Sequence, residues 1–225
     1  MSTPFYVAPE QVMKDRADYA RKGIARGRSL IASTFDDGIV IVAENPSNTL
    51  HKVSEIYDRI GFAGVGKYNE FDQLRIAGIR HADLKGFNYS RHDVDALSLA
   101  NSYAQMLGQT FTHEMKPMEV EILVAEIGDE PDDDQLFHIL YDGTVYDRSG
   151  YAVLGGDAES ITGRLDDGFV ARGDLGAAIT QARDALAGPE RELPAEDLEV
   201  AALGRGNGRR AFRRIVGDEL AGLVG

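Results

Sequence analysis

The sequence has no cysteine, so disulfide bonds, thiolate catalysis and cysteine-ligated metals are all excluded. It also lacks any apolar run close to the roughly 18 residues that a membrane-spanning helix needs. The first residues, Met1 to Tyr6, have neither the basic n-region nor the apolar h-region of a signal peptide. These absences predict a cytoplasmic protein with no membrane partner.

Positive charge is scarce, because 24 Lys and Arg residues stand against 37 Asp and Glu residues, which gives a net charge of −13. Nucleic-acid binding draws its affinity from Lys and Arg contacts to phosphates, so no nucleic-acid partner is expected. One local exception is a cluster of arginines: Arg205, Arg209, Arg210, Arg213 and Arg214. We interpret this cluster as a turn that runs into an edge strand, where charged side chains discourage stray strand pairing.

The 225 residues suit a single domain with a substantial core. Residues 1–8 are short, mixed and interrupted by proline, which predicts a mobile tail. A helix is expected over 9–23, because Pro9 suits the first helical position and Glu10 suits the positive helix end. Residues 28–225 would then form the body of the domain.

Within the body, strands and helices are expected in groups. The predicted strands cover residues 29–34, 39–43, 52–57, 60–65, 120–127, 136–141, 144–147, 151–154, 198–203 and 211–216. The predicted helices cover residues 69–85, a segment capped by Asp93, and segments that start at Asp157 and Asp174. Groups of strands that alternate with paired helices predict antiparallel sheets with helices on their outer faces, an α+β layered domain.

The sequence contains no clear pattern for a metal or cofactor site. The histidines form no compact metal-binding spacing: His51, His81, His92, His113 and His138. The acidic stretch over residues 126–134 lacks the glycine and the distant glutamate of a calcium loop, so we interpret it as a solvated hairpin loop. No metal and no cofactor are therefore predicted.

Residues 61–68 come close to a phosphate-binding loop. They match the pattern G-x-x-x-x-G-K, but Tyr68 stands where a Ser or Thr should bind magnesium. Such a loop also needs a parallel βαβ sheet, whereas the strands before it are paired. Nucleotide binding is the weaker alternative, and the same glycines are explained by close backbone packing or by a groove left open for a partner.

A hydrolase with an N-terminal nucleophile is a second alternative, because Met1 removal would expose Ser2 and further removal would expose Thr3. In such enzymes the free α-amine acts as the base, so the nucleophile must begin the first core strand. Here about 28 residues, including a helix, precede that strand. Neither Ser2 nor Thr3 can reach the required place, which argues for an inactive chain.

Five segments in order resemble the α subunits of the proteasome, and specifically their actinobacterial branch. The segments are Ala20–Gly27 (ARKGIARG), Val42–Ser47 (VAENPS), Leu50–Ala63 (LHKVSEIYDRIGFA), Gly66–Phe71 (GKYNEF) and Arg209–Ile215 (RRAFRRI). The resemblance covers nearly the whole chain. It implies a four-layer αββα sandwich of the N-terminal-nucleophile-hydrolase type, without a catalytic residue of its own.

The resemblance further implies an assembly. Seven copies would form a ring that caps the catalytic β subunits of a threonine-type endopeptidase, and the helix from Pro9 would help to close the ring. The tail would converge on the pore as a gate formed by Met1, Ser2, Thr3, Pro4, Phe5, Tyr6, Val7 and Ala8. Ring-shaped ATPases or ATP-independent activators would dock by their C-terminal tails.

In the proteasome α subunits that this sequence resembles, a lysine binds the carboxylate of the activator tail, and the matching position here is Lys52. The other matching pocket positions are Asp18, Gly27 and Gly66. A lysine suits a terminal carboxylate as a point charge. One departure is the lack of the Tyr-Asp-Arg signature that archaeal and eukaryotic α subunits carry before the first helix, so the coupling of docking to gate opening is not carried over in full. A free-standing oligomeric scaffold without a protease partner stays a further alternative.

Overall fold

The computed structural model describes residues 8–170 and 172–224, and in these residues ten strands form two antiparallel sheets of five. The first sheet has the order β10-β9-β2-β1-β8 and consists of β1 (Leu30–Phe35), β2 (Gly38–Glu44), β8 (Tyr151–Leu154), β9 (Leu198–Gly204) and β10 (Phe212–Ile215). The second follows chain order and consists of β3 (Val53–Tyr57), β4 (Ile60–Gly66), β5 (Val120–Glu126), β6 (Gln135–Ile139) and β7 (Val145–Arg148).

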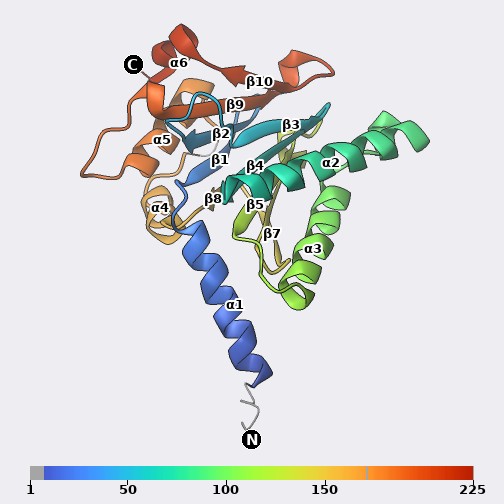
Figure 1. The fold of residues 1–225 in the computed structure, drawn as a ribbon. Helices are drawn as coiled ribbons and strands as arrows, with labels where there is room; N and C mark the ends of the chain where they lie inside the picture. Colours follow the sequence, from blue (N-terminus) through green and yellow to red (C-terminus); the bar gives the residue numbers. More distant parts are fainter. Residues whose placement is uncertain (1–7, 171, 225) are drawn as a thin grey trace, which may run out of the picture.

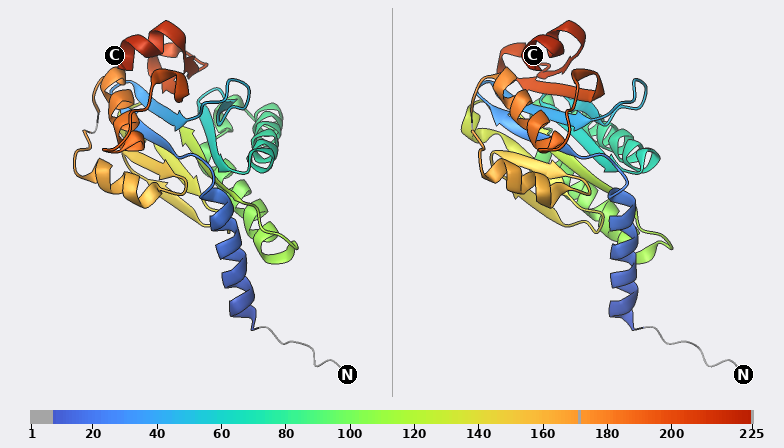
Figure 2. Two further views of the ribbon diagram at one scale, coloured as in Figure 1. Left: turned by 60° about the vertical axis from the view of Figure 1, so that its left-hand side comes forward. Right: turned by 90° about the vertical axis from the view of Figure 1, so that its left-hand side faces the viewer.

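Helices cover the outer faces of both sheets (Figures 1 and 2). The helices are α1 (Pro9–Ile24), α2 (Tyr68–Asn88), α3 (Ala96–His113), α4 (Ala158–Asp166), α5 (Leu175–Ala187) and α6 (Gly217–Val224). The α2 and α3 helices pack on the second sheet, and α4 and α5 pack on the first. The layers are therefore helix, sheet, sheet and helix, as the resemblance implied. No helix among the described residues is long and apolar enough to cross a membrane.

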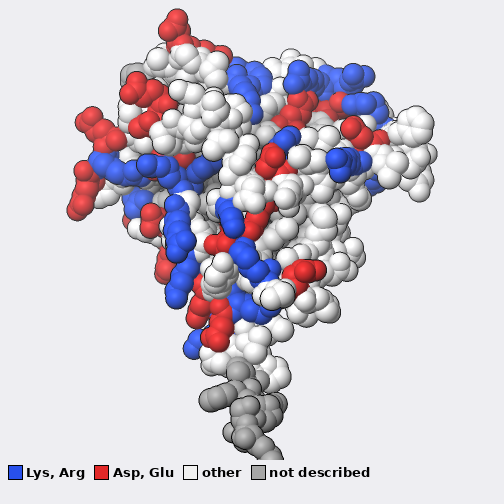
Figure 3. All heavy atoms as spheres, viewed as in Figure 1, with Lys and Arg blue, Asp and Glu red and all other residues white. Residues whose placement is uncertain are grey.

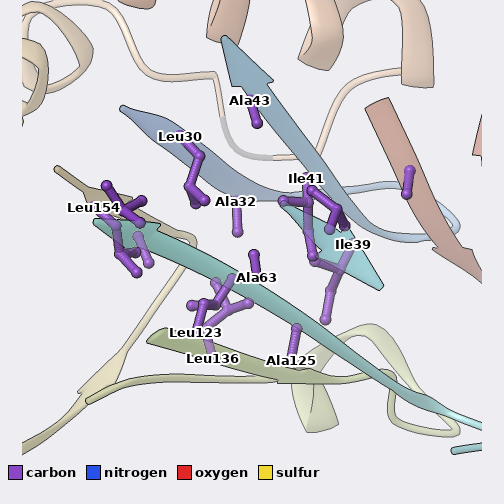
Figure 4. Close-up of a cluster of buried hydrophobic side chains, with 14 of the residues drawn as sticks. Leu30, Ala32, Ile39, Ile41, Ala43, Ala63, Leu123, Ala125, Leu136 and Leu154 are labelled. Atoms are coloured by element: carbon purple, nitrogen blue, oxygen red, sulfur yellow. The ribbon is translucent and has the colours of Figure 1, made fainter. Parts of the chain in front are cut away.

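The β2 strand shows why its sequence is apolar without alternation. Ile39 and Ile41 pack between the sheets (Figure 4), whereas Val40 and Val42 belong to the cluster under α4 and α5. Because successive side chains point to opposite faces, a strand buried on both sides needs apolar residues at every position. The expectation that this strand is covered on both faces is confirmed.

The α1 helix projects from the body toward the N-terminus (Figure 1), yet its middle is fixed to α3. The Arg16 guanidinium donates to the carbonyls of Thr110, Phe111 and Glu114, at 3.1, 2.6 and 2.6 Å. The last carbonyls of a helix lack a full set of partners within it, so Arg16 caps the C-terminal end of α3. Pro9 opens α1 as predicted.

Two predictions about helices are wrong. Asp93 ends a short 3-10 turn, and α3 is instead capped by Asp95, whose carboxylate accepts the backbone N–H of Ser98 at 2.7 Å. The chain also does not end on strands, because α6 follows β10. This helix has only eight residues, too few to be stable alone. Its packing on α5, where Arg183 donates to the carbonyl of Val224 at 2.9 Å, accounts for it.

Residues 61–66 belong to β4 and form no loop. The strand pairs antiparallel with β3 on one side and with β5 on the other. A phosphate-binding loop needs a parallel strand whose end turns into a helix with exposed backbone N–H groups. The geometry therefore rules out the phosphate-binding interpretation of these glycines.

Candidate functional site

Lys52 lies half-buried just before β3 and has one clear acceptor. Its Nζ atom donates to the carbonyl of Arg28 at 2.6 Å. An ammonium carries three N–H bonds, and among the described residues the other two have no acceptor. The side chain is therefore held in place with donors to spare for an incoming acceptor.

Opposing effects act on the pKa of the Lys52 ammonium. Burial lowers the pKa of its ammonium to about 8, while the Glu199 and Glu44 carboxylates raise it and the Arg28 guanidinium lowers it further. Desolvation penalises the charged form of a lysine, so an anion that enters would recover part of that penalty. A carboxylate is the matching ligand for this group.

Gly27 and Gly66 lie against one another beside Lys52. A Cβ atom on Gly27 would be 3.0 Å from the backbone nitrogen of Gly66, and Arg28, the next residue, supplies the carbonyl bound by Lys52. Gly66 has a φ of +103°, and a Cβ there would lie 2.0 Å from the carbonyl oxygen of Glu119. The structure thus brings three of the four predicted pocket residues together, and only glycine fits at Gly66.

Asp18 stands apart from these three residues. It lies half-buried on α1, nine residues before Gly27, and its carboxylate accepts from Arg21 at 3.2 Å. Within one chain, no described contact joins Asp18 to Lys52 or to either glycine. A pocket that used all four residues would need α1 of one copy near Lys52 of another.

The place where α1 meets β1 is closely packed, and we call it the α1 root: residues 23–29 together with Lys52 and Gly66, which lie against them. A Cβ on Gly23 would overlap the Glu119 side chain, and a Cβ on Gly156 would lie 2.6 Å from the Cα of Ala25. A Cβ on Gly155 would lie 2.5 Å from the Oγ of Ser29. The root is therefore a fixed junction on which α1 is mounted.

The comparisons with known proteins agree with this architecture. The family pattern described as Proteasome subunit matches residues 24–197. The chain is 64% identical to Proteasome subunit alpha of Acidimicrobium ferrooxidans over all of this chain and 97% of that one. It is 55% identical to Proteasome subunit alpha of Sanguibacter keddieii, over all of this chain and 90% of that one, and 55% identical to that of Acidothermus cellulolyticus, over all of this chain and 98% of that one.

The chain belongs to the proteasome subunit family.

In this proteasome family member, the predicted gate falls almost entirely outside the described residues. Met1, Ser2, Thr3, Pro4, Phe5, Tyr6 and Val7 lie outside them, and Ala8 is the exposed, extended residue that precedes α1. Its carbonyl accepts the N–H of Gln11 at 2.9 Å. The first core strand starts only at Leu30, so the described α1 helix stands between the tail and the sheet.

Two acidic residues beside Lys52 were not predicted from the sequence. Glu44 ends β2 and is buried, and Arg191 donates to both of its oxygens at 2.9 and 2.7 Å, while Arg28 also binds it. The hydrogen bonds from Arg191 are the largest cause that lowers the pKa of Glu44. Glu199 lies within β9, whose residues are all buried. A lone acid in an apolar strand was the signal available in the sequence for both.

The C-terminal arginines pair with acids of the same chain. The pairs are Arg205 with Asp134, Arg209 with Asp58, Arg210 with Glu55, Arg213 with Glu219 and Arg214 with Glu199. The β10 strand is an edge of the first sheet, as predicted. Two of these pairs reach β3, the edge of the second sheet: Glu55 lies within this strand and Asp58 directly follows it, so Arg209 and Arg210 tie the two sheet edges together. Among the described residues, no group of three or more His, Asp and Glu side chains could hold a metal ion.

Proposed function

We propose that this chain is a non-catalytic α-type subunit of a 20S proteasome. Seven copies form an outer ring that stacks on the catalytic β subunits, and the N-terminal segment controls entry to the chamber. The observation that carries the proposal is the fixed α1 helix ahead of the first core strand. A nucleophile that uses its own α-amine as base must begin that strand, and here the strand begins behind an anchored helix.

A ring of identical copies is supported by the exposed apolar residues of α1. Val12, Met13 and Tyr19 are exposed on a helix that projects from the body (Figure 2). Such residues on a projecting helix are what contact with a second copy would bury. The same contact could bring Asp18 of one copy toward Lys52 of its neighbour, which would complete the four-residue pocket.

Contact with a second ring is supported at the free end of α2. This α2 tip consists of Leu84, Phe87 and Tyr89, with Leu97 at the start of α3 beside it, and Phe87 and Tyr89 are 86% and 78% exposed. The α2 helix starts near the α1 root and runs away from it (Figure 1), and the space-filling view shows few charges at its far end (Figure 3). We assign the tip to the β subunits because it is apolar and lies far from the helix that carries the gate.

Docking of activators is supported by the geometry around Lys52. Its ammonium has donors to spare, and the close packing of Gly27 against Gly66 fixes the backbone beside it, so the site is formed before a tail arrives. A C-terminal carboxylate would bind Lys52, and tail binding would shift the population of particles toward the open state. The partners of this site are ring-shaped ATPases or ATP-independent activators with exposed C-terminal tails.

Co-expression with a catalytic β chain tests the assembly. We expect a four-ring barrel by negative-stain imaging and a mature α chain that starts at or near Met1 by intact-mass analysis. Rings of this chain alone, even with β chains present, would support a free-standing scaffold. Processing of the chain close to Ser29 would instead support an N-terminal nucleophile hydrolase.

Deletion of Met1 to Ala8 tests the gate in the same particle. The truncated particle should hydrolyse small peptides faster than the full-length particle, because the pore would lack its plug. A rate equal to that of the full-length particle, with the barrel intact, would remove the gate from the proposal.

A further inference from the structure

Glu199 is the most heavily hydrogen-bonded acid next to Lys52. Its buried carboxylate faces five donors from three separate parts of the chain. They are the backbone N–H of Lys52 at 2.7 Å, that of Val53 at 3.2 Å, Asn45 Nδ2 at 2.8 Å, Arg214 Nη1 at 2.8 Å and His51 Nδ1 at 3.2 Å. A carboxylate with two oxygens is well matched to this number of donors.

These contacts fix the backbone from which the Lys52 side chain leaves. Two consecutive N–H groups, those of Lys52 and Val53, point at one carboxylate, and Arg214 also donates to the carbonyl of Val53 at 2.6 Å. The start of β3 is thus held by β9 and β10 of the other sheet. Without Glu199, the two N–H groups and the Arg214 guanidinium would lose a buried partner.

Glu199 also contributes a negative charge that acts on the Lys52 ammonium. The charged groups that face the ammonium are Glu199 and Glu44, which raise its pKa, and Arg28, which lowers it together with burial. Further out, Arg191 and Arg28 bind Glu44, while Arg214 and His51 bind Glu199. Among the charges near Lys52, Glu199 is the largest influence that opposes burial.

We propose that Glu199 is the positioning residue of the docking site: it holds Lys52 in place through the backbone and places a negative charge beside its ammonium. The inference rests on the proposed role of Lys52 as the group that binds activator tails. Glu199 does not itself contact the tail and acts only through Lys52. The residue comes from outside the segment that the family pattern matches, which ends at residue 197.

The test is a titration of the Lys52 amine in the assembled particle. Trace acetylation with acetic anhydride, measured by mass spectrometry from about pH 6 to pH 10, reports how much of the amine is uncharged at each pH. The wild type should give a midpoint near 8. Glu199→Gln keeps the shape and one accepting oxygen but removes the charge, so the midpoint should fall by about half a pH unit or more.

Glu196→Gln is the matched control, because it removes one negative charge from an exposed residue three positions away. Its Lys52 midpoint should equal that of the wild type. An unchanged midpoint in Glu199→Gln, or an equal fall in Glu196→Gln, would overturn the proposal.

A second variant covers the case in which the glutamine particle does not assemble. Glu199→Asp keeps the charge but is shorter by one methylene, so it should reach fewer of the five donors. We expect a Lys52 midpoint close to that of the wild type, with faster hydrogen exchange at the N–H groups of Lys52 and Val53. Wild-type exchange at both groups would count against the positioning role.

A peptide-binding measurement tests the docking role of Lys52 separately from the titration. Binding of a fluorescent peptide that carries the C-terminal residues of a ring ATPase from the same organism is measured on the wild type, Lys52→Ala and Glu199→Gln particles. If Lys52→Ala leaves binding unchanged, the docking function fails, whereas the titration still decides whether Glu199 positions Lys52. If both variants weaken binding and the titration shifts as expected, both proposals are supported.

Discussion

The α1 root and the α2 tip are opposite kinds of surface on one small domain. At the root, glycines allow backbone contacts that no other residue fits, and charged groups around Lys52 are half-buried and paired. At the tip, large apolar side chains are exposed. A surface of the first kind recognises a small charged group, because its geometry is fixed before the ligand arrives. A surface of the second kind gains its binding free energy by burying apolar surface area against a partner.

A charged residue in place of an apolar one at the α2 tip should have the largest effect on assembly. Phe87→Glu should abolish stacking on the β subunits, because a carboxylate placed in an apolar contact costs roughly 3 kcal/mol or more, repeated around the ring. Native mass spectrometry or gel filtration of the co-expressed particle measures the loss. Val216→Glu, which charges another well-exposed apolar position, is the control and should assemble normally. A Phe87→Glu particle with four rings would show that the tip is not the ring contact.

The next largest effect concerns the fixed geometry of the root. Gly66→Ala should destabilise the chain by about 2–4 kcal/mol, because φ is +103° and the new Cβ would overlap the Glu119 carbonyl. For a domain of this size the melting temperature should fall by roughly 5–10 °C. Gly163→Ala is the matched control, since nothing lies within 4 Å of the added Cβ. Equal melting temperatures for the two variants would contradict the close packing described for the root.

A smaller effect is expected for the charge at the root. Lys52→Ala should weaken binding of a free-carboxylate tail peptide about 10- to 100-fold, the worth of roughly 1.5–3 kcal/mol of a charged hydrogen bond. Fluorescence anisotropy on the assembled particle measures the affinity. The same peptide with an amidated C-terminus is the control and should bind weakly to both particles. If the amide binds as well as the acid, the site does not read a carboxylate.

The smallest expected effect is a dependence of docking on pH. Lys52 is charged below its pKa of about 8 and neutral above it, and a carboxylate binds the charged form. Affinity should therefore be full at neutral pH and fall by up to about tenfold as the pH rises from 7 to 9. In Lys52→Arg the charge persists over this range, so the pH profile should be flat even if binding is weaker. A steep decline in Lys52→Arg would assign the titration to another group.

Much of the fold was accessible from local patterns. The unbroken apolar run at Ile39–Val42 indicated a strand buried on both faces, and Pro9 marked the start of α1. The cap of α3 was missed by two residues because Asp93 and Asp95 are equally good caps, and only the turn and the buried Val94 between them decide which one the helix uses. The α6 helix was missed because its stability comes from packing on α5.

The candidate site, too, could be predicted only in part from the sequence. The family resemblance pointed to Lys52, Gly27 and Gly66 by their neighbours in sequence, and the structure places these three together. Asp18 does not join them within one chain. Glu199 could not be assigned to the site from the sequence, since it lies 147 residues from the Lys52 backbone N–H that it accepts.

The amino-acid sequence alone was enough to predict the layered α+β architecture and the helix that precedes the first core strand. Both follow from the order of short apolar segments and from chain length, which are local properties. Only the tertiary structure decided what surrounds Lys52: the Arg28 carbonyl, two buried carboxylates and a pKa near 8. A pKa depends on burial and on charges brought close by folding, and in this chain those charges come from β2, β9 and the α1 root.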